Sequence, residues 1–445
     1  MSLYNRLLES ILIPGYNRLR GRSYFRHRAF LEESQWWSPQ RLREFQWKEL
    51  QQLLKHAFEN VPYYRQKYAG AGIALEDIRT WDDFARVPSL TRQEVNEHRA
   101  QLCANNYPGK LLPEATGGSS GTPTRFFITQ ESYDWRAATT DRAYAWSGCR
   151  LGEPVLYLWG APIGSQTAWA RAKDGLFHWL RRELIISTFS QNQEFWDRTW
   201  ARCVAFQPRF IVGYVGSLEQ FVRHADGRAG RLQKLRAVLA AAETLHEHVR
   251  RQVEQTLHVP LFNTYGSREF MSMAVECDRH QGLHVNSENI LLETDRPGEE
   301  GPSEFLVTDL HNYGMPFIRY RIGDVGVLDS SGCACNRGLP KVQSIVGRTL
   351  DVLRGRDGRI IPGEFFPHLL KDIVEVSEFQ VEQKSLEHIV LSVVLTRPMS
   401  TGSDALLKNE LRKVFGDAAN LEIRTVSSIP LRASGKRRVT VGLGL

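Results

Sequence analysis

The chain has 445 residues, of which 42% are hydrophobic and 24% are charged, a composition typical of a globular protein with two or three domains. It excludes collagen-like, disordered and disulfide-framework proteins, and six cysteines in this length predict a reducing compartment, the cytoplasm. The 57 basic residues exceed the 50 acidic residues by seven, which permits anionic substrates such as nucleotides without requiring a nucleic acid as partner.

The first 30 residues are basic and partly apolar. Arg6 and Glu9 interrupt the apolar stretch of residues 1–14, which therefore lacks the continuous core of a secretory signal. No apolar run in the chain reaches the ~20 residues of a membrane-spanning helix. Two aromatic residues, Tyr24 and Phe25, stand among five arginines: Arg18, Arg20, Arg22, Arg26 and Arg28. This cluster is consistent with a solvated helix face, or with contact to a membrane surface or an acidic partner.

An amphipathic helix is predicted over residues 38–58, where apolar side chains recur at steps of three and four before Pro62. Beyond Val155, short apolar runs alternate with helical stretches, which predicts an α/β core with an at least partly parallel sheet. The strand-like runs are 155–159, 210–212 and 259–263, and the helical stretches are 219–224 and 246–257.

The sequence pattern changes from Glu288 onward, where strand-like runs are separated by turns that contain Gly, Pro and Asn. This pattern predicts a β-rich lobe. These runs are 290–293, 304–308 and 325–329. After Val346 the pattern predicts a small α+β domain. Its expected elements are two strands around a turn, a helix, two further strands and a second helix from Asp404. We therefore predict an α/β protein with a large multi-lobed domain over residues 1–346 and a small domain over residues 347–445.

The most informative segment is the loop 116–124, which reads Thr-Gly-Gly-Ser-Ser-Gly-Thr-Pro-Thr. Its glycines let backbone N–H groups approach a polyphosphate closely, and its hydroxyls add hydrogen-bond donors. It is not a Walker loop, because no Gly-Lys-Ser/Thr follows at the required spacing. By composition alone, the segment is either a phosphate-binding loop or an ordinary flexible loop.

Further motifs follow this loop in a fixed order. They are Tyr-Gly-Ser-Arg-Glu at 265–269, Arg-Tyr-Arg-Ile-Gly-Asp at 319–324, Gly-Arg with a later Asp at 347–351, and Ser-Gly-Lys at 434–436. The ordered set resembles the adenylate-forming superfamily of acyl-CoA synthetases. Phrases at 242–245 (Ala-Glu-Thr-Leu) and 333–337 (Cys-Ala-Cys-Asn-Arg) are similar to its phenylacetate-coenzyme A ligase branch, which includes relatives in capsular polysaccharide gene clusters.

The resemblance implies a role in ATP binding for several residues. The residues implied to grip the β- and γ-phosphates are Ser119, Ser120, Gly121 and Thr122. It implies that Tyr265 lies against the adenine, that Asp324 accepts the ribose hydroxyls, and that Glu269 is a catalytic residue binding Mg²⁺. The other implied nucleotide-site residues are Thr116, Glu243, Gly266, Ser267 and Arg348. Without the resemblance, Tyr265 could equally be an ordinary core tyrosine. Glu269 could be a solvated glutamate that caps a helix, and Asp324 could be an aspartate in a turn.

Lys436 is implied to be the catalytic lysine, which bridges the substrate carboxylate and the α-phosphate as negative charge shifts during attack. As part of a charge run alone, this lysine would fit a disordered basic tail. Because Lys436 lies in the small domain, that domain must rotate onto the ATP site. Asp351 is implied to be the hinge that absorbs the rotation.

Three cysteines and one histidine fit a structural metal site. Cys277, His284, Cys333 and Cys335 offer the three thiolates and one imidazole of a tetrahedral zinc centre, with His280 as a substitute ligand. The Cys-x-Cys spacing is tighter than that of the usual zinc knuckle, so the spacing alone does not require a metal. Several members of the resembled branch share this arrangement, which favours Zn²⁺.

The resemblance predicts activation of a carboxylic acid by Mg-ATP to an acyl-adenylate, followed by transfer to the thiol of coenzyme A or of a separate carrier protein. We expect an aromatic or other small organic acid. The candidate pocket walls, which fit core residues as well, are Tyr144, Trp146, Trp159 and Tyr214. The alternatives are transfer of the acyl group to an amine or hydroxyl, and an inactive nucleotide-binding accessory protein of polysaccharide assembly. A homodimer is compatible with the sequence.

Overall fold

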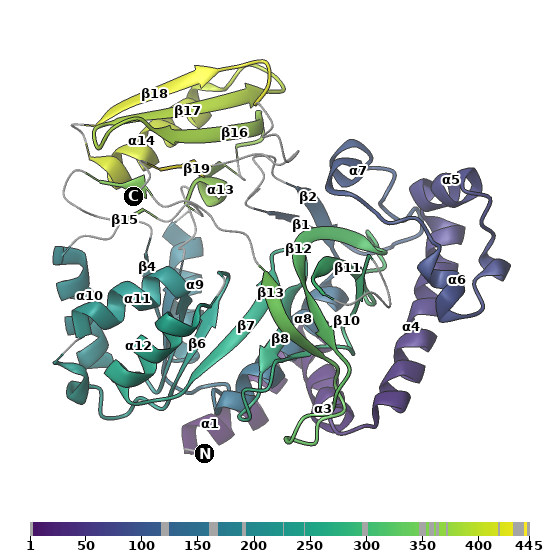
Figure 1. Ribbon diagram of the computed structural model, residues 1–445, viewed down its shortest axis with the longest axis horizontal. Helices are drawn as coiled ribbons and strands as arrows, with labels where there is room; N and C mark the ends of the chain where they lie inside the picture. The colour runs from purple at the N-terminus through teal and green to yellow at the C-terminus, as the bar shows by residue number, and fades with distance from the viewer. Residues whose placement is uncertain are drawn as a thin grey trace. The chain divides into compact units, whose positions relative to one another are not determined.

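The computed structural model describes residues 3–116, 124–159, 168–188, 193–225, 227–243, 245–295, 301–346, 353–355, 360–361, 365–370, 373–416, 419–429 and 440–442 (Figure 1). The chain divides into two compact units that interleave along the sequence. Unit 1 comprises residues 1–114, 125–152 and 262–348, and unit 2 comprises residues 115–124, 153–261 and 349–445. The division expected at residues 346 and 347 stays a prediction.

Helices dominate the first 150 residues of unit 1. They are α1 (Leu3–Leu7), the π-helical η1 (Leu8–Leu12), α2 (Ile13–Leu19), α3 (Tyr24–Ser34), α4 (Pro39–Asn60), α5 (Pro62–Gly70), η2 (Leu75–Asp77), α6 (Trp81–Ala85), α7 (Arg92–Glu97), α8 (Gln130–Tyr144) and η3 (Ala145–Ser147). The helix α4 confirms the predicted one. It begins where Ser38 accepts a hydrogen bond from Arg41 N and Pro39 occupies the first turn.

The strands of unit 1 form a short hairpin and a larger antiparallel sheet. The hairpin is β1 (Leu112–Ala115) with β2 (Arg125–Ile128). The larger sheet follows the order β10 (Ile290–Thr294), β11 (Ser303–Asp309), β12 (Tyr320–Asp329), β13 (Lys341–Val346), β9 (Leu283–Val285), β8 (Met271–Glu276), β7 (Leu261–Ser267). The strands predicted at 290–293, 304–308 and 325–329 are therefore confirmed.

Helix α8 is held against this sheet by buried ion pairs. Arg142 and Glu288 are completely buried and lie 3.0 Å apart, and Arg136 contacts Asp309 at 2.5 Å. Glu288 also accepts a hydrogen bond from Ser34 Oγ at 2.6 Å, so α3, α8 and the sheet meet at one carboxylate. Buried charges such as these need several hydrogen bonds to offset the loss of hydration.

Unit 2 begins with a parallel sheet in the order β4 (Glu183–Ser187), β3 (Val155–Trp159), β5 (Phe210–Tyr214), β6 (Ala237–Ala241). The strands β5 and β6 are buried along their whole length, as expected for parallel strands covered on both faces. The connecting helices are α9 (Ala168–Leu180), α10 (Gln193–Phe206), α11 (Val215–Ala225), the short η4 (Ala229–Arg231) and α12 (Glu247–Leu257). Figure 1 shows α11 and α12 on the near side of β6, and the predicted α/β core is confirmed.

The described residues between 353 and 442, all in unit 2, form a small α+β arrangement. Its four-stranded sheet follows the order β18 (Asn420–Thr425), β17 (His388–Leu395), β16 (Val376–Gln383), β19 (Thr440–Val441), and α14 (Thr401–Phe415) covers it with Leu407 and Leu411 (Figure 1). A short pair, β14 (Leu353–Arg354) and β15 (Ile360–Ile361), and helix α13 (Phe365–Leu370) precede this sheet. In the part of the chain that the structure describes, no helix is both long and apolar enough to cross a bilayer.

Candidate active site

The end of β7 carries the motif Tyr265-Gly266-Ser267 and turns sharply into β8. The register shifts between Tyr265 and Gly266, and Gly266 then pairs with Ser272. A Cβ atom at Gly266 would lie 2.2 Å from the carbonyl oxygen of Met271, so no other residue fits this hairpin without backbone movement. The glycine predicted to serve the nucleotide site thus has a local structural reason as well.

The side chains of Tyr265 and Asp324 are in direct contact. The Tyr265 hydroxyl donates a hydrogen bond to Asp324 Oδ2 at 2.9 Å, and the ring packs 6.1 Å from that of Phe305. Three strands separate β7 from β12 in the sheet order, so the sheet must coil strongly to bring these side chains together. The residues predicted to hold the adenine and the ribose therefore lie side by side.

Glu269 lies in a buried polar group next to this pair. Only 3% of its surface is exposed, and its Oε1 accepts a hydrogen bond from the Tyr320 hydroxyl at 3.3 Å. Arg92 Nη2 lies 3.8 Å from the same oxygen. A buried carboxylate beside a single arginine and a phenol can act as a ligand for a hard cation.

Arg92 was missed by the sequence analysis, although a local signal marks its helix. Thr91 and Glu94 form a capping box, which starts α7 at Arg92. A backbone bridge fixes the position of this helix, because Leu90 N donates to Arg319 O and Arg321 N donates to Leu90 O. These contacts span more than 220 residues, so nothing in the sequence near Arg92 points to Glu269.

Ser267 contributes an unsatisfied hydroxyl at the same strand end. Its Oγ is buried and has no hydrogen-bond partner among the residues that the structure describes. An unpaired buried hydroxyl is costly, and a polar ligand atom would satisfy it. The nucleotide-binding role of Ser267 stays a prediction.

The base of the glycine-rich loop is held closed by Thr116 in unit 2. Thr116 N donates to Thr124 O at 2.9 Å, and Thr124 N donates to the Thr116 hydroxyl at 3.0 Å. The hydroxyl of Thr116 therefore shapes the loop base. Ser119, Ser120, Gly121 and Thr122 lie outside the described residues, as do Arg348, Asp351 and Lys436. Their predicted roles stay predictions.

Glu243, predicted to bind the nucleotide, caps a helix in unit 2. Its Oε2 accepts a hydrogen bond from Gly216 N at 2.6 Å, in the first turn of α11. Burial raises the pKa of this carboxyl, whereas the Gly216 hydrogen bond lowers it. The preceding residue, Ala242, has a positive φ of 68°, a conformation that L-residues rarely adopt. Such strain is common beside functional groups.

The aromatic residues predicted as pocket walls lie in packed surroundings. Tyr214 is buried and its ring lies 4.5 Å from that of Trp159, where both join the hydrophobic core around Leu353 and Phe365. Trp146 Nε1 donates a hydrogen bond to Gln35 Oε1 at 2.9 Å.

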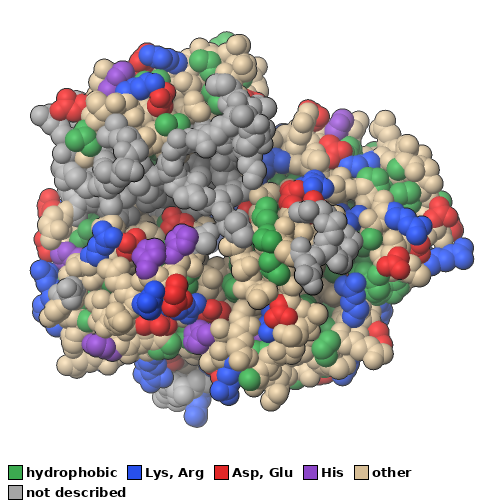
Figure 2. Space-filling view, in the orientation of Figure 1, with side chains coloured by type: hydrophobic (Ala, Val, Ile, Leu, Met, Phe, Trp, Pro, Cys, Tyr) green, Lys and Arg blue, Asp and Glu red, His purple; other side chains and the backbone are tan. Residues whose placement is uncertain are grey.

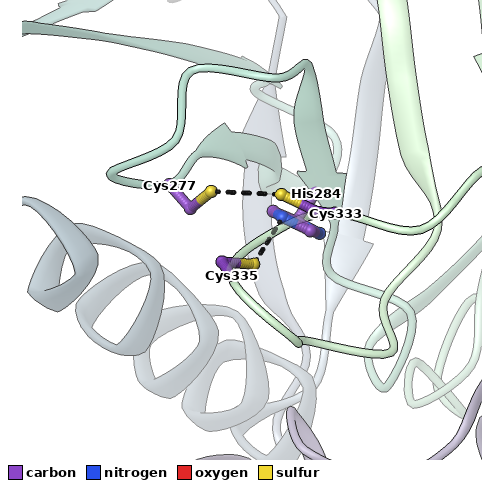
Figure 3. A group of neighbouring side chains, drawn as sticks. All are labelled: Cys277, His284, Cys333 and Cys335. Carbon is purple, nitrogen blue, oxygen red and sulfur yellow. Dashed lines mark hydrogen bonds between the residues drawn. The ribbon is translucent and has the colours of Figure 1, made fainter.

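The predicted metal ligands come together in unit 1. Cys277 follows β8, His284 lies on β9, and Cys333 and Cys335 lie in the loop after β12 (Figure 3). Their four ligand atoms all lie within 4.8 Å of one another. Cys277 Sγ is 3.7 Å from Cys333 Sγ, and Cys335 Sγ is 3.2 Å from His284 Nε2. Neighbouring ligand atoms in a tetrahedral zinc site are about 3.5–3.8 Å apart, so the set could hold such an ion.

The surroundings of this cluster orient its ligands. His284 Nδ1 lies 3.1 Å from the carbonyl oxygen of Leu339, which directs Nε2 toward the sulfur atoms. The backbone N–H groups of Arg279 and Arg337 donate to the sulfurs of Cys277 and Cys335. His280, the substitute ligand in our prediction, instead contacts Glu276 Oε2 at 3.1 Å.

The acid–base properties of the cluster suit the binding of a cation. Burial raises the pKa of Cys277 to about 12 and lowers that of His284 to about 4. Burial opposes ionisation of Cys335 as well, but the hydrogen bonds from Arg337 leave its pKa below the usual value. A bound cation would stabilise the thiolates that this pocket otherwise disfavours.

Comparisons with known proteins agree with the geometry. Residues 353–442 match the model of the CapK C-terminal domain. A phenylacetate-coenzyme A ligase of Thermus thermophilus is 27% identical over 384 residues, with 81% of this chain and 82% of the relative covered. The protein CapK of Staphylococcus aureus is 22% identical over 414 residues, with 90% and 89% covered.

A solved structure extends the comparison to the fold. The chain matches 2-hydroxyisobutyryl-CoA ligase, in complex with 2-HIB-AMP and CoA, with a TM-score of 0.58, 20% identity, and 91% and 90% of the two chains covered. The fold is therefore that of an adenylate-forming acyl-CoA ligase with a C-terminal domain. In sequence the chain is similar to the phenylacetate-coenzyme A ligases and to CapK, which confirms the resemblance seen in the sequence.

Proposed function

We propose that the protein activates a carboxylic acid with ATP and transfers the acyl group to coenzyme A. A carboxylate oxygen attacks the α-phosphorus, the bond to the bridging oxygen breaks, and pyrophosphate leaves. The coenzyme A sulfur then attacks the acyl carbon of the adenylate, the thiol proton is released, and AMP leaves with the former carboxylate oxygen. The observation that carries this proposal is the Tyr265–Asp324 hydrogen bond beside buried Glu269, in a chain related to acyl-CoA ligases over four fifths of its length.

Each residue has a defined part in this reaction. Tyr265 offers its ring to the adenine while its hydroxyl holds Asp324, the carboxylate that would accept the ribose hydroxyls. Glu269 would hold Mg²⁺, which neutralises charge on the phosphates. Lys436 would stabilise the negative charge that develops at the α-phosphate.

Pyrophosphate exchange tests the first step. The purified protein, a panel of aromatic and short-chain carboxylic acids and labelled pyrophosphate should give acid-dependent incorporation of label into ATP. Glu269→Gln should abolish it, whereas the matched surface variant Glu247→Gln should not. Absence of exchange with every acid, together with no heat of ATP binding in calorimetry, would refute the activity.

Mass spectrometry of the product identifies the molecule that accepts the acyl group. With coenzyme A present, the expected product is the acyl-CoA thioester plus AMP. A second candidate, which the similarity to CapK leaves open, is transfer to an amine, a hydroxyl or a separate carrier protein. An enzyme that forms adenylate but no thioester would favour this second candidate.

Replacing Lys436 tests whether the small domain takes a different position in each of the two half-reactions. Lys436→Ala should block adenylate formation and leave thioester formation from a supplied acyl-adenylate largely intact. Lys384→Ala, on the strand-turn region of the same domain, serves as the matched control. Equal losses in both half-reactions would contradict the two-position scheme.

The cluster of Cys277, His284, Cys333 and Cys335 is proposed to hold a structural Zn²⁺. Four protein ligands leave no open position for a substrate. Metal analysis should find about one zinc per chain, and Cys335→Ser should lose it, while Cys103→Ser, outside the cluster, should keep it. A fully folded, metal-free preparation would contradict the assignment.

A further inference from the structure

The helical segment 3–19, formed by α1, η1 and α2, has an inverted polarity. Its buried side carries two asparagines, Asn5 and Asn17, together with Leu8. Its solvent side carries large aliphatic residues with the following exposed fractions: Leu7 43%, Ile11 61%, Leu12 45% and Leu19 89%. Helices on a globular protein normally turn their apolar face inward. An exposed aliphatic stripe therefore indicates a surface that is covered by something else.

The polar side of the segment is firmly seated on unit 1. Glu9 forms an ion pair with Arg28 on α3 at 3.0 Å, and both side chains are largely buried. Leu8 and Asn5 pack beside Gly152, where a Cβ atom would lie 2.9 Å from the Leu8 side chain. The segment consequently cannot rotate to bury its aliphatic stripe without breaking these contacts.

The charges around the stripe are basic. Between residues 3 and 26 the exposed charged side chains are all arginines: Arg6, Arg18, Arg20 and Arg26. The acidic groups nearby are engaged, since Glu9 pairs with Arg28, Asp134 pairs with Arg22, and the exposed Glu131 pairs with Arg26 and His27. In contrast, basic and acidic side chains are interspersed over the face shown in Figure 2.

We propose that residues 3–26 dock the protein onto an anionic membrane surface. Aliphatic side chains flanked by arginines supply the two attractions, apolar insertion and electrostatic binding, that stable attachment to an interface requires. A segment of 17 helical residues is about 25 Å long, which suits a helix lying in the plane of the headgroups. This inference is independent of the proposed ligase activity.

A second copy of the chain fits this surface less well. A symmetric dimer built on the segment would place the same patch on both partners. Arg18 and Arg20 of one copy would then face arginines of the other, and like charges oppose such contact. Charge complementarity therefore favours an anionic lipid surface over self-association.

Vesicle flotation tests the proposal with the full chain. The protein should float with vesicles of equimolar phosphatidylglycerol and phosphatidylcholine but not with phosphatidylcholine alone. Raising NaCl from about 0.1 to about 1 M should weaken binding, because the Debye length falls from ~10 to ~3 Å. Arg18→Gln with Arg20→Gln should weaken binding roughly 25-fold, about fivefold per arginine.

A second double variant, Ile11→Gln with Leu19→Gln, tests the contribution of the aliphatic side chains. It should weaken binding to the anionic vesicles roughly tenfold or more. Both double variants change exposed positions, so their thermal midpoints should match that of the unmodified protein. The matched control, Leu386→Gln with Arg251→Gln, alters exposed residues elsewhere and should bind as the unmodified protein does. Sedimentation velocity of all variants reports self-association in parallel.

Three outcomes would overturn the proposal. They are equal binding to both vesicle types, no binding to either, and unchanged binding by both double variants. Self-association that the double variants remove, without any vesicle binding, would assign the surface to a protein contact instead.

Discussion

The Tyr265 hydroxyl donates its hydrogen bond to Asp324 across a sheet in which their strands, β7 and β12, are not neighbours. This single contact sets the distance between an aromatic ring and a carboxylate that belong to motifs 59 residues apart. In the proposed reaction, these two side chains would hold the adenine and the ribose of one nucleotide.

We expect Tyr265→Phe to raise the KM for ATP about tenfold with little change in kcat. The variant keeps the aromatic face but loses a hydrogen bond to a charged acceptor, typically ~1.5–3 kcal/mol. Steady-state kinetics with ATP varied at saturating acid measures this effect, with Tyr133→Phe as a surface control. A lower kcat at unchanged KM would mean that the hydroxyl acts in the chemical step.

The buried pair Arg142–Glu288 should be far more sensitive to a single replacement than to a double one. Arg142→Leu strands a buried carboxylate, and we expect a loss of about 3–5 kcal/mol in the free energy of unfolding. Arg142→Leu with Glu288→Leu should lose clearly less than the sum of the two single variants. Urea denaturation measures all three, and the exposed pair Arg198–Glu194 gives the reference, at most ~0.5 kcal/mol. Additive losses would show that the two side chains are not coupled.

The buried imidazole of His311 should make the protein less stable in mild acid. Burial lowers its pKa from 6.5 to about 4, against the hydrogen bond between Nε2 and the carbonyl oxygen of Glu288. Between these pH values the unfolded chain binds a proton that the folded chain does not. The free energy of unfolding should therefore fall as pH decreases from 6.5 toward 4, by about 3 kcal/mol in total.

His311→Gln isolates this contribution. The glutamine can still donate a hydrogen bond but does not titrate, so the stability difference from the unmodified protein should shrink as pH falls. Denaturation curves between pH 7 and pH 4 measure the difference, with exposed His246→Gln as the control. Parallel curves for the unmodified protein and His311→Gln would rule out a role for this imidazole.

Gly266→Ala should disrupt the β7–β8 hairpin. The added methyl group would meet the carbonyl oxygen of Met271 at 2.2 Å, so we expect both a lower thermal midpoint and loss of ATP binding. Gly402→Ala adds the same group in open space on α14 and should be neutral or slightly stabilising. Similar midpoints for both variants would show that the hairpin tolerates a side chain.

Local patterns predicted those parts of the fold that depend on neighbours in sequence. The helix over 38–58 followed from its apolar spacing, and Ser38 and Pro39 mark its start. Two strands of the parallel sheet, β3 and β5, followed from short apolar runs, whereas β4 and β6 were not predicted. The metal-ligand set was named from its residue types together with the family resemblance, and the structure brings its four ligand atoms within 4.8 Å of one another.

Long-range polar contacts could not be predicted in this way. Helix α8 buries Asp134, Arg136 and Arg142, so its sequence lacks an apolar stripe. The acidic partner of Arg142 is Glu288, in the turn before β10 and 146 residues away, and that of Arg136 is Asp309, at the end of β11 and 173 residues away. Arg92 reaches Glu269 only through the bridge between Leu90 and Tyr320. The inverted polarity of residues 3–19 likewise depends on which face the rest of unit 1 covers.

The loop that carries Cys333 and Cys335 has a consequence for biosynthesis. Gln35 Oε1 accepts hydrogen bonds from both Trp146 Nε1 and Arg337 Nε, and the Arg337 guanidinium stacks over Trp36 and Trp146. These segments enter the ribosomal exit tunnel 111 and 302 residues apart. The contacts of Arg337 with Gln35, Trp36 and Trp146 can therefore form only after three quarters of the chain has been translated.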